Sequence, residues 1–212
     1  MKLVKLMLAD DHTLLLESFR KLLERDFDIV GVVADGRALL KEAAALKPEV
    51  VLLDIGMPLL NGLDAGRRLR ATMPGLKLIF LTMNEDPDLA IEAMRLGASG
   101  YLLKACAASE LFQAITAAVR GKSYVTPQIA RGMQDIFVRD PEAKPRRITV
   151  TPRQREVLQL LAEGKSMKQA ADVLNVSART IAFHKYQMME ELGVKSTAGL
   201  IQYAIKSHVV AA

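Results

Sequence analysis

The stretch Val50-Val51-Leu52-Leu53-Asp54 carries four aliphatic residues directly into a carboxylate. A continuous apolar run of this length is typical of a strand that is buried on both faces of a parallel sheet. Such a strand delivers Asp54 to its carboxyl end, where open α/β sheets bind their ligands. Gly56, Met57-Pro58 and Asn61-Gly62 follow, and these residues favour a loop. Two interpretations of the stretch remain open, a functional acid or a cap of the next helix.

Strand and helix patterns alternate on both sides of this stretch. Short apolar runs predict the strands, and segments with helical spacing or Ala/Leu-rich composition predict the helices. The strands are predicted at residues 3–9, 29–34, 50–53, 76–81 and 100–103, and the helices at 14–25, 36–46, 63–73, 86–96 and 109–119. Five strand–helix pairs with short links predict a right-handed, parallel, doubly wound α/β sheet of five strands over residues 1–120.

The alternation of strand and helix patterns ends after residue 120. Residues 121–147 are punctuated by proline and charge, are compatible with a helical segment at 129–138, and are interpreted as an interdomain linker. Short helices alone are predicted beyond it, at residues 152–163, 167–174, 178–192 and 197–207. The second and third, joined by a tight turn, are typical of a helix-turn-helix DNA reader. A small all-α domain is therefore predicted at 148–212, and the alternative is a four-helix bundle without a ligand.

Composition narrows the class of protein. The chain has 212 residues, which is enough for two domains of ordinary size. Its single cysteine, Cys106, excludes an intrachain disulfide and is compatible with a reducing cytosol. No apolar run approaches the ~18 residues of a membrane span, and the first residues do not form a secretory signal. We expect a cytoplasmic protein with no membrane partner.

The positive charge is concentrated in the second part of the chain. Residues 1–124 hold 16 Lys/Arg and 16 Asp/Glu, whereas residues 125–212 hold 13 and 8, so that the whole net charge of +5 lies there. A basic module beside a neutral one favours double-stranded DNA as the partner of the former.

Polar residues follow four of the predicted strands at their carboxyl ends. Asp10 and Asp11 follow the first strand, Asp54 the third, Thr82 the fourth and Lys104 the fifth. A doubly wound sheet brings these ends together. Three carboxylates in one crevice repel each other unless a cation is present, and hard oxygen ligands favour Mg²⁺. A Lys ammonium and a Thr hydroxyl complete a site that can handle a phosphoryl group. Each residue also has a plain alternative, as a helix cap, a strand end or a solvated charge.

Two sets of motifs carry a family resemblance. The first set is Asp10-Asp11, Asp54 with Met57-Pro58 and Gly62, Thr82, and residues 97–104, and the second is residues 151–154, 156–158, Ala162, Gly164, 177–184 and 192–194. With these motifs, residues 1–120 resemble the flavodoxin-like receiver domain of a two-component response regulator. Residues 149–207 resemble a LuxR-type helix-turn-helix. A receiver domain followed by this kind of helix-turn-helix domain resembles the NarL/FixJ group of transcription regulators.

The resemblance implies the roles of the acidic residues. Asp54 is the implied acceptor of a phosphoryl group from a sensor histidine kinase. Asp11, Asp54 and the backbone carbonyl of Gly56 are the implied ligands of Mg²⁺, and Asp10 reaches the ion through water. The phosphate adds roughly 1.5–2 negative charges and strong acceptors to the site.

The resemblance also implies a switch. Lys104 pairs with the phosphoryl oxygens, Thr82 moves to hydrogen-bond the phosphoryl group, and the rotamer of Tyr101 follows Thr82. This changes the packing on the face formed by residues 86–96, the fifth strand and the last receiver helix. We expect this face to form a dimer contact or to release the helical domain, and we expect a homodimer when the protein is phosphorylated.

The predicted DNA reader is the helix at 178–192. Its candidate DNA contacts, with one from the preceding helix, are Lys168, Arg179, Thr180, Ala182, Phe183, His184, Lys185 and Tyr186. The base-reading positions fall on Ala182, Phe183 and Tyr186, while Lys168, Arg179 and Lys185 suit phosphates. Phe183 either meets a thymine methyl or packs in the core. Ile181, Met188 and Leu192 have core spacing, and His184 is interpreted as a packing residue that does not bind a metal.

This sequence departs from the family pattern at two kinds of position. Ala105 follows Lys104 where the family often has proline, and Ala182 and Glu190-Glu191 replace residues that are often basic. A phosphatase-like hydrolase that uses Asp54 is disfavoured, because Gly56 stands where a second Asp acts as general acid, so no turnover of an external substrate is expected. The other alternative is a phosphorylation-independent DNA-binding regulator whose receiver domain serves as a dimerisation scaffold.

Overall fold

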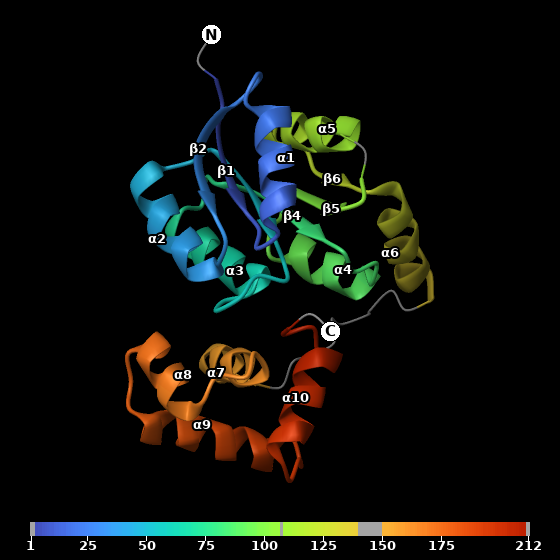
Figure 1. Ribbon diagram of the computed structural model, residues 1–212. Helices are drawn as coiled ribbons and strands as arrows, with labels where there is room; N and C mark the ends of the chain where they lie inside the picture. The colour runs from blue at the N-terminus through green and yellow to red at the C-terminus, as the bar shows by residue number, and fades with distance from the viewer. Residues whose placement is uncertain (1–2, 107, 140–149, 211–212) are drawn as a thin grey trace. The chain divides into compact units, whose positions relative to one another are not determined.

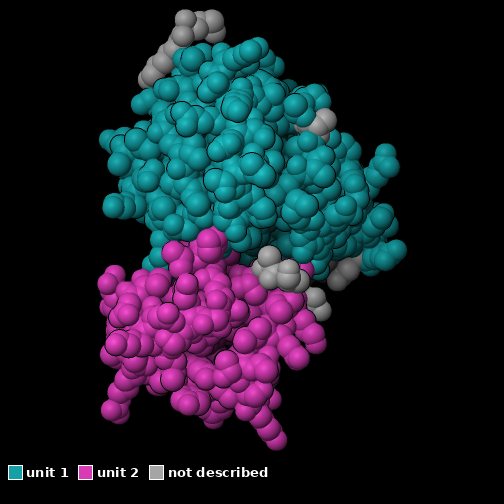
Figure 2. Space-filling view, in the orientation of Figure 1, with its two compact units in different colours: residues 1–57, 62–145 teal, residues 58–61, 146–212 magenta. Residues whose placement is uncertain are grey.

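The computed structural model describes residues 3–106, 108–139 and 150–210 (Figure 1). The chain divides into two compact units, which Figure 2 shows in different colours. The first unit holds residues 1–57 and 62–145, and the second holds residues 58–61 and 146–212. The predicted boundary between residues 147 and 148 lies outside the described residues and stays a prediction.

The first unit is built on one parallel sheet with the strand order β2-β1-β3-β4-β5-β6. The strands are β1 (Lys5–Ala9), β2 (Asp28–Val33), β3 (Val50–Asp54), β4 (Lys77–Thr82), β5 (Gly100–Leu103) and β6 (Tyr124–Val125). The helices are α1 (Thr13–Leu23), α2 (Gly36–Leu46), α3 (Gly62–Thr72), α4 (Pro87–Arg95), α5 (Ala108–Val119) and α6 (Pro127–Arg139). The predicted doubly wound α/β fold is confirmed, with α1 and α5 on one face of the sheet and α2, α3 and α4 on the other (Figure 1).

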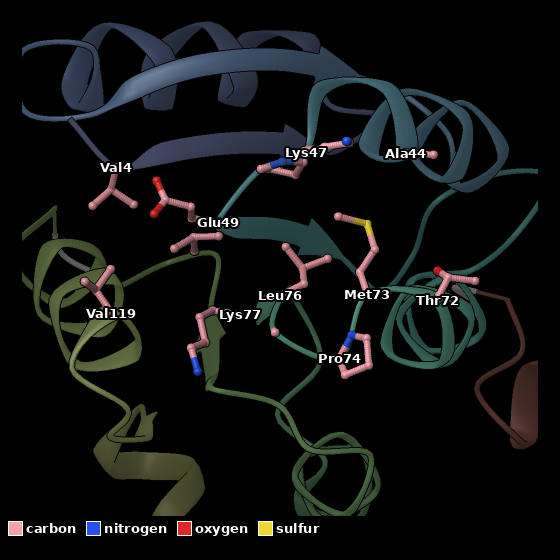
Figure 3. Close-up of a pocket in the computed structure, with 13 residues that line it drawn as sticks. Val4, Ala44, Lys47, Glu49, Thr72, Met73, Pro74, Leu76, Lys77 and Val119 are labelled. Atoms are coloured by element: carbon pink, nitrogen blue, oxygen red, sulfur yellow. The ribbon is translucent and has the colours of Figure 1, made fainter. Parts of the chain in front are cut away.

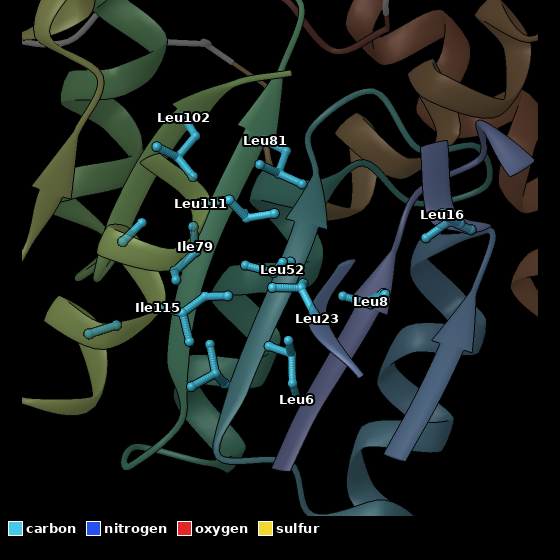
Figure 4. Packing of buried hydrophobic residues seen from close by; sticks show 13 residues of the cluster. Leu6, Leu8, Leu16, Leu23, Leu52, Ile79, Leu81, Leu102, Leu111 and Ile115 are labelled. Atoms are coloured by element: carbon cyan, nitrogen blue, oxygen red, sulfur yellow. The ribbon is translucent and has the colours of Figure 1, made fainter. Parts of the chain in front are cut away.

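The central strands are apolar because both of their faces are covered. All five residues of β3 are buried. Leu52 points with its counterparts in β1 and β4 towards α1 and α5 (Figure 4), where Leu23, Leu111 and Ile115 meet it, and Val50 belongs to the same buried cluster. The alternate residues of the same strands face the opposite helices. This two-sided burial explains why the strands read as continuous apolar runs in the sequence.

The number of strands predicted from the sequence was wrong by one. The sixth strand, β6, has two residues and pairs in parallel with β5, as Tyr124 N donates to Ser99 O at 3.1 Å and Thr126 N donates to Tyr101 O at 3.0 Å. Two residues are too few for an alternating pattern to be recognised. The helix α6 follows directly, with Pro127 at its first position, where a missing N–H costs nothing.

Residues 124–139, which were interpreted as linker, therefore pack on the first unit. A Cβ added to Gly132 of α6 would lie 2.6 Å from Pro87 Cγ, so the two helices α6 and α4 approach closely at this glycine. Gln128 Nε2 donates to Glu85 Oε2 at 2.7 Å beside this contact. The face around α4 and β5, which we expected to form a dimer contact or to release the helical domain, packs against the chain's own β6 and α6.

The second unit is all helical among its described residues 150–210. Its helices are α7 (Pro152–Ala162), α8 (Met167–Leu174), α9 (Ala178–Glu191) and α10 (Thr197–Lys206). The side chain of an N-cap Thr or Ser accepts a backbone hydrogen bond at the start of each helix, from Thr151, Ser166, Ser177 and Ser196. Asn175, with φ 51°, takes the left-handed conformation that ends α8 and turns the chain into α9.

These four helices share one aliphatic core. Leu158 and Leu161 of α7, Leu174 of α8, Ile181 of α9 and Leu200 of α10 belong to the same buried cluster. The α8–turn–α9 pair thus has the helix-turn-helix arrangement that the sequence predicted. Since the cluster uses one side of α9 only, the other side of this helix is left for solvent or a ligand.

The start of α3 provides a test of how tightly β3 is held. A Cβ on Gly62 would lie 2.1 Å from the backbone oxygen of Asp54, which cannot yield as a flexible side chain can. Gly62→Ala should therefore lower the free energy of unfolding by about 1–3 kcal/mol. The control is Gly75→Ala, since a Cβ there meets nothing within 4 Å. Equal urea midpoints for the two variants, followed by circular dichroism, would contradict the close approach.

Candidate functional site

The carboxyl edge of the sheet brings together the polar residues that follow β1, β3, β4 and β5. Backbone hydrogen bonds hold the strand ends in register, because Ile55 N donates to Leu81 O at 3.0 Å and Lys104 N donates to Thr82 O at 2.8 Å. Asp10 is 1% exposed and Asp54 is 3% exposed, and Thr82 and Lys104 are also buried. All four were predicted to meet here, and they do.

Lys104 is the cation of this buried cluster. Its Nζ lies 2.9 Å from both carboxylate oxygens of Asp10 and 3.1 Å from Asp54 Oδ2. Asp10 Oδ1 and Asp54 both accept a hydrogen bond from this ammonium, whereas Asp10 Oδ2 is held by charge alone. One ammonium thus faces two buried carboxylates, and the cluster keeps excess negative charge.

The pKa of Asp54 is determined first by its burial and then by the charges beside it. Burial raises the pKa of Asp54 above its ordinary value, and the neighbouring Asp10 carboxylate raises it further. Lys104 and a hydrogen bond from the Gly56 backbone act against this rise without cancelling it. The charge of ionised Asp54 is therefore not fully compensated by its neighbours. A cation, or a covalently bound group that changes the charge of the site, would act on this uncompensated charge.

A residue that the sequence interpretation missed completes the cluster. His12 Nδ1 lies 2.9 Å from Asp10 Oδ1, 3.0 Å from Asp11 Oδ1 and 3.1 Å from Lys104 Nζ. The available signal was its position, directly after the Asp10-Asp11 pair at the end of a strand. Ligand atoms of Asp10, Asp11, His12 and Asp54 all lie within 4.8 Å of one another. This donor set, with uncompensated carboxylates, fits a divalent cation.

Thr82 and Tyr101 lie next to one another in the two neighbouring strands β4 and β5. Thr82 Oγ1 accepts a hydrogen bond from Asn84 N at 2.9 Å. Tyr101 is fully buried, and its hydroxyl has no hydrogen-bond partner of good geometry among the described residues. Burial raises the pKa of Tyr101, and the nearby Asp86 carboxylate adds to the rise. Tyr101 is thus a neutral aromatic held inside the sheet's edge.

The free face of α9 carries most of the predicted DNA contacts. Phe183 is 63% exposed and Tyr186 is 61% exposed, so the alternative that Phe183 packs in the core is wrong. Lys185 Nζ lies 5.7 Å from the centroid of the Tyr186 ring. The exposed residues of the predicted set also include Lys168 and Arg179, while Thr180, Ala182, His184 and Lys185 are half-buried.

The other side of α9 supports this face. Ile181 and Met188 are fully buried and Leu192 packs partly against the same core, as their spacing predicted. His184 Nδ1 is buried and accepts or donates no hydrogen bond within the described ranges. The ring of His184 packs edge-on against Phe183 at a centroid distance of 5.6 Å.

Comparison with known proteins decides the family. Residues 6–116 match the response regulator receiver domain, and residues 149–204 match the luxR family of bacterial regulatory proteins. The chain is also 31% identical over 215 residues to the oxygen regulatory protein NreC of Staphylococcus aureus strain JH9, over 98% of this chain and 99% of that protein. The chain belongs to the LuxR-type response regulators.

Solved structures of the same family resemble this response regulator over its whole length. The response regulator RcsB of Salmonella typhimurium has a TM-score of 0.66 at 29% identity, over 98% of this chain and 99% of that one. RcsB from Salmonella enterica serovar Typhimurium, bound to a promoter in the presence of the phosphomimetic BeF3−, has a TM-score of 0.62 at 30% identity, with the same coverage. The family predicted from the sequence is confirmed.

The response regulator also has a cavity of about 670 Å³, at the opposite edge of the sheet. Figure 3 shows it between the amino ends of β3 and β4, with Glu49, Leu76 and Lys77 in its wall. No cluster of acids converges on it within the described residues. The functional cluster at the carboxyl edge of the sheet thus lies apart from this cavity. No described helix is long and apolar enough to cross a membrane.

The charge imbalance at Asp54 predicts a stability effect. Because the folded pKa of Asp54 exceeds the unfolded one, its favourable contribution is complete below the unfolded pKa and is lost as the pH rises through the folded pKa. Asp54→Asn should therefore raise the free energy of unfolding at pH 7 in metal-free buffer, by on the order of 1 kcal/mol. The measurement is urea unfolding in EDTA. The exposed Asp26 gives the control, Asp26→Asn, and a destabilised Asp54→Asn would contradict the imbalance.

Proposed function

We propose that Asp54 accepts a phosphoryl group from a sensor histidine kinase and that phosphorylation controls DNA binding by α9. The observation that carries the proposal is the buried cluster, in which Asp54 Oδ2 lies 3.1 Å from Lys104 Nζ. In the transfer, the P–N bond of the kinase phosphohistidine breaks and a P–O bond to an Asp54 oxygen forms. We also propose a cytoplasmic location, because the proposed partner of α9 is DNA.

Mg²⁺ is the proposed cofactor. Asp11, Asp54 and the backbone carbonyl of Gly56 would hold it, with Asp10 joined through water. The ion would supply positive charge next to the phosphoryl oxygens. Burial and the neighbouring Asp10 carboxylate both raise the pKa of Asp54 against the opposing effect of Lys104, and this supports the assignment.

Lys104 is proposed to hold the transferred group in place. Its ammonium is fixed at the ends of Asp10 and Asp54, so that it needs little movement to meet an oxygen on Asp54. Hydrogen bonds between an ammonium and a charged oxygen are roughly twice as strong as neutral ones. The chain offers no acid at Gly56 to activate another substrate, and we propose no turnover beyond loss of its own phosphoryl group.

The signal is proposed to leave the site through Thr82 and Tyr101. Thr82 Oγ1, which now accepts from Asn84 N, would turn to donate to the phosphoryl group and vacate space beside Tyr101. Tyr101 O in turn accepts from Thr126 N at 3.0 Å, so that β5 is bonded to β6 and thus to the segment that begins α6. The first element to feel a movement of Tyr101 would be this segment.

A homodimer on double-stranded DNA is the proposed active form. RcsB dimers are found bound to two parallel DNAs in a structure with a TM-score of 0.62 to this chain. On α9, Arg179, Lys185 and the preceding Lys168 are proposed to contact phosphates. The proposed base-reading side chains are Ala182, Phe183 and Tyr186, with Thr180 and His184 beside them. Two exposed aromatic rings close to Arg179 and Lys185 on α9 support a surface that is covered by a ligand.

The proposed route of the signal predicts the behaviour of Thr82→Ala. With Mg²⁺ and acetyl phosphate, intact mass should show one added phosphate on the wild type and on Thr82→Ala, and none on Asp54→Asn. Phosphorylation should increase operator affinity several-fold to about a hundredfold in the wild type, a coupling of about 1–3 kcal/mol. Thr82→Ala should lose most of that gain.

Each result separates two claims. Equal labelling of Asp54→Asn would remove Asp54 as the acceptor. An undiminished gain in phosphorylated Thr82→Ala, measured by titration of the same operator, would mean that the signal leaves by another route. Tight operator binding by the unphosphorylated wild type, with no gain on phosphorylation, would favour a receiver that acts as a dimerisation scaffold.

The assignments on α9 predict two different losses. Lys185→Ala in the full-length chain should weaken binding to all DNA sequences alike and reduce the salt slope of log K by about 1, because one phosphate contact is lost. Phe183→Ala should change the sequence preference that is found by selection from a random DNA library. Arg95→Ala on α4 is a control for the loss of a positive charge outside the reader. Unchanged DNA binding in both α9 variants would mean that another element enters the groove.

A further inference from the structure

We propose that His12 gives the cation centre a nitrogen ligand, so that the centre binds first-row transition ions such as Mn²⁺ and Co²⁺ in preference to Mg²⁺. The inference rests on the proposed cation site of Asp11 and Asp54 and deepens it, since it names the class of metal that this chain selects. Within the described ranges, no other group of His, Cys, Asp and Glu side chains converges in this way.

The imidazole of His12 is directed at the acidic cluster by its backbone. His12 is the N-cap of α1, yet its side chain makes no capping hydrogen bond to that helix. Instead, His12 N donates to Asp10 Oδ1 at 2.9 Å, which fixes the residue beside the carboxylates. Its Nδ1 then lies 3.0 Å from Asp11 Oδ1, although much of the ring is open to solvent. His12 Nδ1 is thus held beside the carboxylates and does not stabilise α1 by capping it.

The distances suit a common ion. Bonds of about 2.1 Å to nitrogen and oxygen place ligands on opposite sides of an ion about 4.2 Å apart. The ligand atoms of Asp10, Asp11, His12 and Asp54 lie within 4.8 Å of one another, so shifts of a few tenths of an ångström close the set. Asp10 Oδ2 is buried 2.9 Å from Lys104 Nζ, so the proposed ion would lie beside this ion pair.

The chemistry of the donors sets the preference. Mg²⁺ takes oxygen ligands and keeps its waters, whereas imidazole nitrogen suits the transition ions. A purely carboxylate site discriminates weakly between Mg²⁺ and Mn²⁺, since both accept oxygen. One nitrogen added to the carboxylates of Asp11 and Asp54 shifts the balance towards the transition ion. The competing interpretation is that His12 is only an ion-pair partner of Asp10 and Asp11.

A substitution that exchanges nitrogen for oxygen separates these two interpretations. In His12→Asn, the Asn Oδ1 can occupy the place of His Nδ1, so an oxygen ligand is kept for Mg²⁺. Because Asn also caps helices well, His12→Ala serves as a second variant that cannot cap α1. His208→Asn is the matched control, because it removes an imidazole that lies beyond the C-terminal end of α10. All binding is measured on the full chain at one pH.

Calorimetric titration with Mg²⁺, Mn²⁺ and Co²⁺ gives the first readout. In both His12 variants, Mn²⁺ and Co²⁺ affinity should fall by about 10–100-fold, the range known for loss of partners around a metal. Mg²⁺ affinity should change little in His12→Asn, and His208→Asn should match the wild type. An equal loss for all three ions, or no loss for any, would overturn the proposal.

Pulsed electron paramagnetic resonance of the Mn²⁺-loaded chain gives the second readout. A ¹⁴N coupling of a directly bound imidazole should be present in the wild type and in His208→Asn, and absent in both His12 variants. Absence of this coupling in the wild type would leave His12 as an ion-pair partner only. Failure of the proposed function is a different result, because Asp11→Asn would then bind all three ions as well as the wild type.

Discussion

The structure depends on a balance of charge at the carboxyl edge of a sheet whose strands are otherwise apolar. Asp54 is placed there by β3, all of whose residues are buried, so its carboxylate cannot be solvated like a surface acid. Lys104 provides the compensating charge from two strands away, at 3.1 Å. Removing Lys104 from this set would leave buried negative charge uncompensated, which commonly costs about 3–5 kcal/mol. The ends of β1, β3 and β5 are therefore bound together electrostatically, in addition to their backbone pairing.

This balance also explains why the site is incomplete by itself. Two buried carboxylates, an exposed one and a single ammonium leave net negative charge, and burial in addition raises the pKa of Asp54. A cation lowers that cost, and a phosphoryl group on Asp54 adds oxygens that Lys104 can bind. The charges of the free site are not fully compensated. A ligand that compensates them therefore changes the free energy of the site strongly. The same reasoning gives His12 its significance, since it adds a nitrogen to an already crowded set of oxygens.

Much of the fold could be predicted because its signals are periodic and long. The helix α2 and the strand β5 have the bounds that their patterns predicted, and the convergence of Asp10, Asp54 and Lys104 follows from parallel topology alone. β6 could not be predicted, because two residues carry no period and only pairing with β5 defines it. The position of the His12 ring depends on a rotamer and on the Asp10 carboxylate, neither of which the sequence states. The exposure of Phe183 was likewise undecided, since both faces of α9 contain apolar residues.

Each unit has a feature that is unusual in a packed protein, namely buried charge in the first unit and exposed aromatic rings in the second. Each feature indicates a ligand. The receiver edge buries charge that water would otherwise solvate, whereas α9 exposes rings that a core would otherwise bury, with Phe183 63% exposed. The core of the second unit does not require those rings, because Ile181 and Met188 already fill it. Covering one large aromatic side chain contributes roughly 1.5–3 kcal/mol, and releasing counterions from DNA adds to it. The carboxyl edge of the receiver sheet and the exposed apolar helix face therefore each gain stability only when occupied, which is the condition for a protein whose two functions can be regulated by what it binds.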